Sequence, residues 1–211
     1  MDVFVKGANS INLFDTPLYM NENIGLSYGA LAIKRVFDII FSILFLILFS
    51  PLLLIVAILI KFEDGGPVFY KQKRCTMNGK IFPIYKFRSM IVDAEKDGQV
   101  IPAKDEDNRI TKIGKFIRRF HIDEIPQFYN VLKGDMSVVG PRPERVEHVE
   151  KYSKEIPEFY YRMKVRGGIT GYAQVYGKYN TTPEDKLIMD LQYIVNYSFL
   201  LDLQIMLETV K

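Results

Sequence analysis

The sequence has little of the side-chain chemistry that builds disulfides and zinc sites. Among its 211 residues there is one cysteine, Cys75, and there are two histidines, His121 and His148. A single cysteine excludes an internal disulfide and a cysteine-rich zinc site, which fits a protein of a reducing compartment. Two histidines also argue against a histidine-based metal cluster.

The sequence also lacks a strong excess of positive or negative charge. Its composition is not that of a disordered chain. The formal net charge is +3, so the 28 Lys and Arg matter only where they cluster. Hydrophobic residues make up 48% of the chain, which is enough to bury a proper core. The length allows one large domain or two small ones.

A long apolar run changes the class of protein that we expect. No formal charge occurs in the 22 residues from Ile39 to Ile60. At about 1.5 Å per residue, a helix of this length could cross the hydrocarbon core of a bilayer. A buried helix of a soluble protein normally keeps a polar face, so membrane association is favoured. Just before the run, Asp38 is spaced to pair with Lys34 or Arg35 on one helical face.

Ser50-Pro51 lies near the middle of this run and predicts a kink. The proline removes one backbone hydrogen bond and crowds the carbonyl of Ile47. Two shapes remain open: a bent helix that spans the bilayer, or a helix-break-helix that returns to the side it entered from. The residues alone favour spanning, although basic residues at both ends, Lys34-Arg35 and Lys61, fit re-entry better.

The flanking segments differ in character. Residues 1–33 are mixed and rich in turn residues, which predicts a tail or the remnant of an upstream region. Residues 68–74 and 80–90 alternate enough to predict two short strands around Asn78-Gly79. Residues 93–108 are polar and acidic, as in a solvated loop.

Residues 109–120 predict a basic amphipathic helix, and residues 186–211 predict one or two further helices. The apolar stripe of the first helix consists of Ile110, Ile113, Phe116, Ile117 and Phe120. An ordinary surface helix, an interfacial helix that faces anionic lipid, and a helix whose basic side chains face a phosphorylated substrate are all compatible with this pattern.

Two adjacent carboxylates, Asp123 and Glu124, precede Pro126 within an apolar segment. Proline suits the first turn of a helix, so one carboxylate is expected at a helix N-terminus. The simplest interpretation is an N-cap with a first-turn acid. Because adjacent helical residues point about 100° apart, the two carboxylates are expected to have different roles, such as attacking an electrophile and holding a cation.

Two arginines are candidates for phosphate binding. Arg142 lies between Pro141 and Pro143, whose stiff backbone could aim a guanidinium at a phosphate. Arg166 precedes the glycine-rich stretch 167–177, whose backbone could approach a ligand closely. A solvated arginine in a proline turn is an equally good interpretation of the first segment alone, and glycine-rich loops are common in proteins of many functions.

Seven ordered segments together resemble the bacterial sugar transferases, which are monotopic polyprenyl-phosphate hexose-1-phosphate transferases. The segments are IKRVFDI, FSP, FYKQKR, IYKFRSM, IRRFHIDEIPQFYNVLKGDMSVVGPRPE, VRGGITGYAQV and DLQYI. The resemblance covers about Ala32 to Lys211 and implies the catalytic part of a longer-type member. The implied fold is α+β: a tail (1–33), a re-entrant membrane hairpin broken at Ser50-Pro51 (34–62), and a small cytoplasmic αβ catalytic core with interfacial helices (63–211).

The resemblance also implies a reaction. Asp123 matches a nucleophile that attacks a UDP-sugar, releases UMP and passes the sugar phosphate to undecaprenyl phosphate, which initiates exopolysaccharide, O-antigen or glycan synthesis. Glu124 matches the second acid and is expected to hold Mg²⁺. Lys86, Arg118, Arg142 and Asp190 match positions that support phosphate or the active site, and Arg166 stays a candidate from the residues alone.

The implied location is the cytoplasmic face of the bacterial inner membrane, in contact with bilayer lipid and without a nucleic-acid partner. A homodimer is one of the assembly states left open, and no stretch identifies the sugar. Gly167 and Tyr172 replace the proline and tryptophan common in the family, which puts donor-sugar contacts in doubt. The alternatives are a membrane-tethered scaffold or regulator of polysaccharide export, and a soluble nucleotide-binding enzyme with an apolar core helix.

Overall fold

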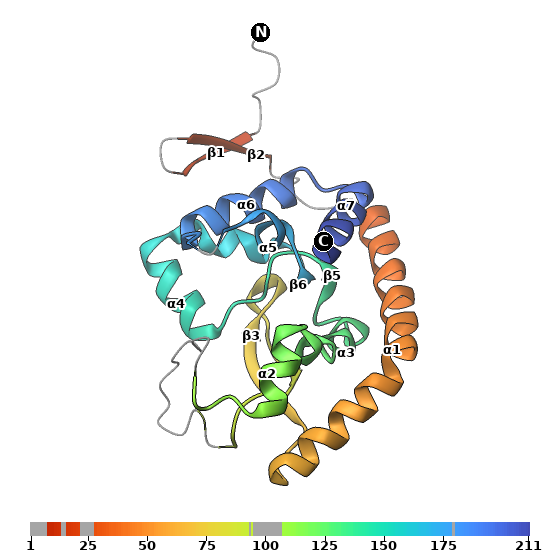
Figure 1. Cartoon of the computed structure of the whole chain (residues 1–211). Helices are drawn as coiled ribbons and strands as arrows, with labels where there is room; N and C mark the ends of the chain where they lie inside the picture. Colours follow the sequence, from red (N-terminus) through yellow and green to blue (C-terminus); the bar gives the residue numbers. More distant parts are fainter. Residues whose placement is uncertain (1–7, 14–15, 22–27, 93, 95–106, 179) are drawn as a thin grey trace.

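The protein is described by a computed structural model over residues 8–13, 16–21, 28–92, 94, 107–178 and 180–211. Figure 1 shows a body of helices around short strands, with one long helix along its side. The described strands form two antiparallel pairs, β1 (Ala8–Leu13) with β2 (Thr16–Asn21) and β3 (Phe69–Cys75) with β4 (Ile81–Phe87), and one parallel pair, β5 (Ser137–Val139) with β6 (Gly168–Thr170).

The helices are α1 (Tyr28–Asp64), α2 (Lys112–Arg119), α3 (Gln127–Lys133), α4 (Val146–Glu155), α5 (Tyr172–Tyr176), α6 (Pro183–Val195) and α7 (Phe199–Val210). Three 3-10 segments are η1 (Met77–Gly79), η2 (Ile122–Glu124) and η3 (Pro157–Lys164). The predicted mixture of helices and strands is therefore confirmed, as are the strand pair around Asn78-Gly79 and the C-terminal helices, of which there are two. The segment predicted as a tail contains the β1–β2 hairpin, and nearly all of the predicted loop 93–108 lies outside the described residues.

Helix α1 continues through Pro51 and bends near its middle (Figure 1). Proline cannot donate to the carbonyl of Ile47, one turn earlier, and the Ser50 hydroxyl donates to that carbonyl instead at 2.8 Å. The predicted kink is present. The predicted break into two separate helices is not observed, because a serine side chain replaces the missing backbone donor and the helix runs on.

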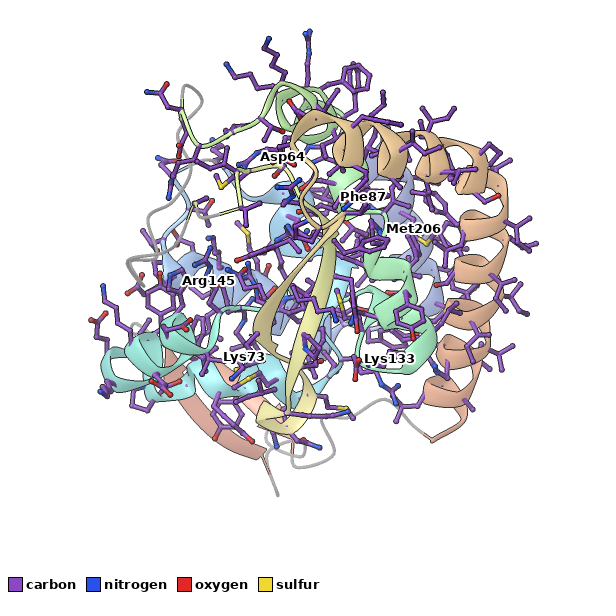
Figure 2. All side chains as sticks on the ribbon, turned by 90° about the horizontal axis from the view of Figure 1, so that it is seen from below. Asp64, Lys73, Phe87, Lys133, Arg145 and Met206 are labelled. Atoms are coloured by element: carbon purple, nitrogen blue, oxygen red, sulfur yellow. The ribbon has the colours of Figure 1, made fainter. Side chains whose placement is uncertain are left out.

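The outer face of α1 is apolar and exposed. Its stretch Gly29–Asp64 is long and apolar enough to span a membrane by length and composition, yet only 11% of its most apolar window is buried against the protein. Ile47 and Leu48 are 65% and 73% exposed. Figure 2 shows α1 along one edge of the molecule with its outer side chains pointing away from the body. Such a surface is typical of lipid contact and argues against the core helix of a soluble enzyme.

The inner face of α1 is polar near its start and joins the helix to the rest of the protein. Lys34 forms a buried ion pair with Asp202 of α7 at 2.6 Å. Arg35 donates to two backbone carbonyls at the C-terminal end of α3, and Asp38 accepts bonds from the start of β5. The predicted pairing of Asp38 with Lys34 or Arg35 is therefore wrong, because each of the three side chains finds a partner in another element.

Helix α2 is attached to the far end of α1. Glu63 of α1 accepts hydrogen bonds from the first two amides of α2 at 2.7 and 3.2 Å. Ile117 is fully buried against the second half of α1, whereas Phe116 and Phe120 are 56% and 57% exposed. The predicted single apolar stripe is thus divided: Ile113 and Ile117 pack inward, and the two phenylalanines are exposed.

Candidate active site

A cleft of about 660 Å³ opens between the β3–β4 pair, α2, η2 and the loop that follows β5. Two carboxylates, Asp123 and Glu124, lie in its wall. The Lys and Arg residues that line it are Arg74, Lys86, Arg88, Arg118, Arg142 and Arg145. Positive charge is in excess, so the cleft favours a ligand with several negative charges, such as a diphosphate.

The backbone turns sharply to bring the two carboxylates into this cleft. His121 follows α2 in the left-handed region, with φ 54°, which few residues other than glycine adopt. The 3-10 turn η2 then carries Asp123 and Glu124, and Pro126 forms the N-cap of α3 without a side-chain capping bond. The simple interpretation of the dyad as an N-cap is therefore not borne out.

Glu124 is held by two cations. Its Oε1 accepts from Lys86 Nζ at 2.6 Å and from a terminal nitrogen of Arg142 at 2.5 Å, and its Oε2 accepts from the other terminal nitrogen of Arg142 at 3.2 Å. Burial alone would raise the pKa of Glu124, but the charges and hydrogen bonds of Arg142 and Lys86 outweigh it and hold the pKa far below its usual range. Glu124 is thus expected to be ionised near neutral pH, and its two partners fix its position.

Asp123 has a different environment. Its residue is only 9% exposed, it borders the cleft, and its side chain forms no hydrogen bond to another residue in the part of the chain that the structure describes. Burial raises the pKa of Asp123, Lys86 opposes this rise, and the neighbouring Glu124 adds to it. A carboxylate at the wall of a basic cleft that no described residue hydrogen-bonds has its lone pairs available to a ligand.

A second cavity lies on the other side of the Glu124–Arg142 pair. It is an apolar groove of about 840 Å³ between α1, α3 and α7. Its aromatic wall includes Phe41, Phe45, Phe49 and Phe128, and Met206 lines it from α7. His121, Glu124 and Arg142 border both the groove and the cleft. The basic cleft and the apolar groove therefore meet at one side-chain pair.

Most of the predicted site residues come together, and two do not. Lys86, Arg118 and Arg142 line the cleft with the two carboxylates. Asp190 lines neither cavity, since it is 1% exposed and pairs with Arg162 at 2.6 Å. Arg166 also lines neither. The structure thus does not place these two predicted phosphate-binding residues at the cleft.

Sequence reasoning missed other residues of the cleft. Arg74, Arg88 and Arg145 line it, and His121 lies between the two cavities. Alternation along β3 could have found Arg74, because every second residue of that strand, from Tyr70 to Arg74, borders the cleft. The approach of the segments that carry Arg88 and Arg145 depends on tertiary packing, which no local pattern reveals.

Asp123 and Glu124 could hold a metal ion only together with ligands from the substrate. Among the described residues there is no group of three or more His, Cys, Asp or Glu side chains that could hold one. Magnesium, however, commonly binds through one or two carboxylates together with substrate phosphates. Oε2 of Glu124 accepts a single hydrogen bond of 3.2 Å, and Asp123 lies beside it at the same cleft. The residues present therefore fit a magnesium ion that arrives with a diphosphate.

The sequence was compared with protein families and with proteins of known activity. The sequence profile of the family described as "Bacterial sugar transferase" matches residues 29–211. The chain is 47% identical over 182 residues to a UDP-N-acetylgalactosamine-undecaprenyl-phosphate N-acetylgalactosaminephosphotransferase of Aeromonas hydrophila, covering 85% of this chain and 43% of the relative. It is 45% identical over 211 residues to a UDP-glucose:undecaprenyl-phosphate glucose-1-phosphate transferase of Klebsiella pneumoniae, covering 98% and 43%.

A UDP-glucose:undecaprenyl-phosphate glucose-1-phosphate transferase of Escherichia coli K12 is 41% identical over 211 residues, covering 98% of this chain and 44% of the relative. The chain thus spans less than half the length of each of these three relatives.

Proposed function

The chain belongs to the bacterial sugar transferase family, and from this premise we propose that it transfers a sugar phosphate from a UDP-sugar to undecaprenyl phosphate. The named relatives act on these two substrate classes. The observation that carries the proposal is the meeting of a basic cleft and an apolar groove at the Glu124–Arg142 pair, with Asp123 in the cleft wall. A water-soluble diphosphate suits the cleft, and a phosphate on a long apolar chain suits the groove.

In the first step, the Asp123 carboxylate attacks the sugar-proximal phosphorus of the donor. The new bond joins an aspartyl oxygen to phosphorus, and the bond from phosphorus to the UMP oxygen breaks, so UMP leaves. Arginine and lysine side chains of the cleft offset the charge of the diphosphate and let an anionic nucleophile approach. Asp123 suits this role because no other described residue hydrogen-bonds its side chain, whereas both oxygens of Glu124 are engaged.

In the second step, a phosphate oxygen of the acceptor attacks the same phosphorus. The aspartyl bond breaks, Asp123 returns to a free carboxylate, and the product is a polyprenyl-diphosphate sugar. Glu124 keeps Lys86 and Arg142 in place through both steps. Magnesium, held by Glu124 together with the donor diphosphate, would supply further charge compensation.

The membrane has a direct role in this proposal. The groove is bordered by α1, whose outer face is apolar and exposed, so the isoprenoid chain of the acceptor could pass from the bilayer to the dyad without crossing water. We place the protein at the cytoplasmic face of the inner membrane, with α1 bent so that both of its ends lie on that face. A homodimer and the absence of a nucleic-acid partner stay predictions.

Cysteine labelling tests this topology. Gly29→Cys and Lys73→Cys, each in a Cys75→Ser background, place thiols before and after the apolar segment. Both should resist a membrane-impermeant maleimide in spheroplasts and react after permeabilisation. Labelling of only one of the two thiols from outside would exclude re-entry, and labelling of both would exclude the cytoplasmic face.

The scaffold alternative required a dyad that only caps a helix, and neither carboxylate does so. The deciding experiment supplies the purified protein with Mg²⁺, polyprenyl phosphate and a panel of UDP-sugars and measures UMP. Asp123→Asn should abolish UMP release, because a carboxamide is a poor nucleophile. Asp135→Asn is the matched control, since Asp135 is a buried, ion-paired aspartate outside both cavities. No UMP from any donor, or full activity of Asp123→Asn, would reject the proposal.

A further inference from the structure

The loop that carries Arg142 is held through its backbone carbonyls. Two of its residues, Pro141 and Pro143, have no amide hydrogen to donate. At one end, the carbonyl of Pro141 accepts from the amide of Gly168 at 2.9 Å. At the other end, the carbonyl of Glu144 accepts from the amide of Cys75 at 2.9 Å. Both ends of the loop are therefore tied to neighbouring backbone segments.

Two arginine side chains hold the carbonyls in between. A terminal nitrogen of Arg162 donates to the carbonyl of Arg142 at 3.0 Å, and one of Arg74 donates to the carbonyl of Pro143 at 3.0 Å. Each carbonyl from Pro141 to Glu144 thus accepts a hydrogen bond. Arg74 lines the cleft, whereas Arg162 lies behind the loop and lines neither the cleft nor the groove.

The orientation of the Arg162 side chain is fixed by Asp190. Oδ2 of Asp190 in α6 accepts from Nε of Arg162 at 2.9 Å and lies 2.6 Å from the terminal nitrogen that donates to the carbonyl of Arg142. Arg162 and Asp190 are 5% and 1% exposed. Because two adjacent nitrogens of one planar guanidinium share a single buried carboxylate oxygen, the guanidinium has little freedom to rotate. The N–H that reaches the carbonyl of Arg142 is directed by this contact.

We propose that Arg162, oriented by Asp190, is a positioning residue for Arg142. The coupling runs from a buried carboxylate through one guanidinium to the main chain of Arg142, and from the side chain of Arg142 to Glu124. It gives Asp190 a part in the reaction without any contact with substrate. The proposal rests on the proposed function, in which Arg142 holds Glu124 and contacts the donor diphosphate.

The kinetic test uses Arg162→Lys and Asp190→Asn, with Asp202→Asn as matched control. Asp202 is equally buried and ion-paired, to Lys34, but does not touch the loop. A lysine keeps the charge but cannot hold Asp190 at two points and the Arg142 carbonyl together. For Arg162→Lys we expect kcat per folded molecule to fall about 10- to 100-fold, as for a small misplacement of a group at the reacting centre. The donor KM should change less than about twofold.

A double-mutant cycle separates positioning from folding. In an Arg142→Ala background, Arg162→Lys should cause no further loss of kcat, because its effect passes through the missing side chain. Additive losses in the double variant would overturn the proposal. A kcat per folded molecule of Arg162→Lys equal to that of Asp202→Asn would overturn it as well. If Asp190→Asn fails to fold, Arg162→Lys decides the outcome, since it leaves Asp190 opposite a cation.

Amide hydrogen exchange provides a readout that needs no turnover. The amides of Gly168 and Cys75, which bind the loop carbonyls, should exchange faster in Arg162→Lys than in the wild type and stay protected in Asp202→Asn. Unchanged protection in Arg162→Lys would overturn the positioning role even if the enzyme is active. A wild type that releases no UMP would reject the proposed function and leave this measurement valid.

Discussion

Arg142 and Glu124 are joined by two hydrogen bonds of 2.5 and 3.2 Å, and Lys86 shares the same carboxylate at 2.6 Å. One negative charge thus compensates two cations at the point where the cleft and the groove meet. This arrangement implies that Glu124 supports the reaction by holding its neighbours, while Asp123 remains available to the donor.

Glu124→Gln tests that division of roles. The amide keeps the shape of the side chain but leaves Lys86 and Arg142 uncompensated, so both cations can bind the donor diphosphate in the ground state. We expect kcat to fall at least about tenfold while the donor KM stays equal or decreases. Steady-state UMP release over a range of donor concentrations measures both. A higher KM with an unchanged kcat would show instead that Glu124 serves only in binding.

The raised pKa of Asp123 has consequences for activity and for stability. The nucleophile must be ionised, so the acid limb of kcat/KM should lie above about 4, the value of an ordinary aspartate. Between its unfolded and folded pKa values the folded state binds more protons, so the contribution of Asp123 to stability falls as pH rises through that window.

Removing this charge should therefore stabilise the protein near neutral pH. Asp123→Asn is expected to be inactive and yet to melt at a higher temperature than the wild type in the same detergent. At a pH below both pKa values the difference should disappear. A lower melting temperature at neutral pH would contradict a carboxylate that is penalised by burial.

The apolar groove predicts a defect that is specific to the acceptor. Phe49 lines the groove, whereas the adjacent Leu48 is exposed and does not. Phe49→Ala should raise the KM for a long-chain polyprenyl phosphate about tenfold, in keeping with the loss of part of an aromatic contact. UMP release in the presence of donor alone should be unaffected. Leu48→Ala should leave the acceptor KM and the UMP release with donor alone unchanged. Equal effects of the two substitutions would show that the groove does not bind the acceptor.

Gly167 departs from the proline common in the family, and the structure gives a reason. Its amide donates to the Thr76 hydroxyl at 3.1 Å, and a Cβ atom there would lie 2.4 Å from Cγ of Pro143. Gly167→Pro would lose this bond and crowd the loop of Arg142, so we expect about 1–3 kcal/mol of destabilisation in thermal or denaturant unfolding. Gly29→Ala, where a Cβ meets nothing within 4 Å, is the control. A neutral Gly167→Pro would mean that the loop adjusts freely.

The positions of Gly167 and Tyr172 also bear on whether these residues contact the donor sugar. Gly167 and Tyr172 line neither the cleft nor the groove, and Tyr172 lies beside Tyr176 with their ring centroids 4.6 Å apart. Their departures from the family pattern therefore act on packing behind the site rather than through direct contact from the cleft wall.

Features of the sequence that depend on local chemistry could be predicted. The apolar run, the kink at Pro51, and the strands on either side of Asn78-Gly79 follow from the order of residues along the chain. The dyad stood out for a similar reason, since two adjacent charges in an apolar segment need partners. The nature of those partners could not be predicted in this way. Lys86 meets Glu124 across 38 residues because β4 packs beside η2.

The errors arose where tertiary contacts replaced local ones. Asp38 was expected to pair within its own helix, but β5 offers it a backbone amide at 3.0 Å. The apolar stripe of α2 was expected to face one way, but its apolar side chains are divided between the core and the exposed surface. Ile117 faces the protein, while Phe116 faces outward. A helix with apolar side chains on both its buried and its exposed side has no single hydrophobic face for periodicity to reveal.

The central claim is that Asp123 forms a covalent bond to phosphorus. The most direct measurement is intact-protein and peptide mass spectrometry after rapid quenching of the enzyme with UDP-sugar and Mg²⁺ in the absence of acceptor. The account predicts a sugar-phosphate adduct on the peptide that contains Asp123, which disappears when polyprenyl phosphate is added and never forms in Asp123→Asn. Product formation without any such adduct at any quench time, or an adduct on another residue, would contradict it.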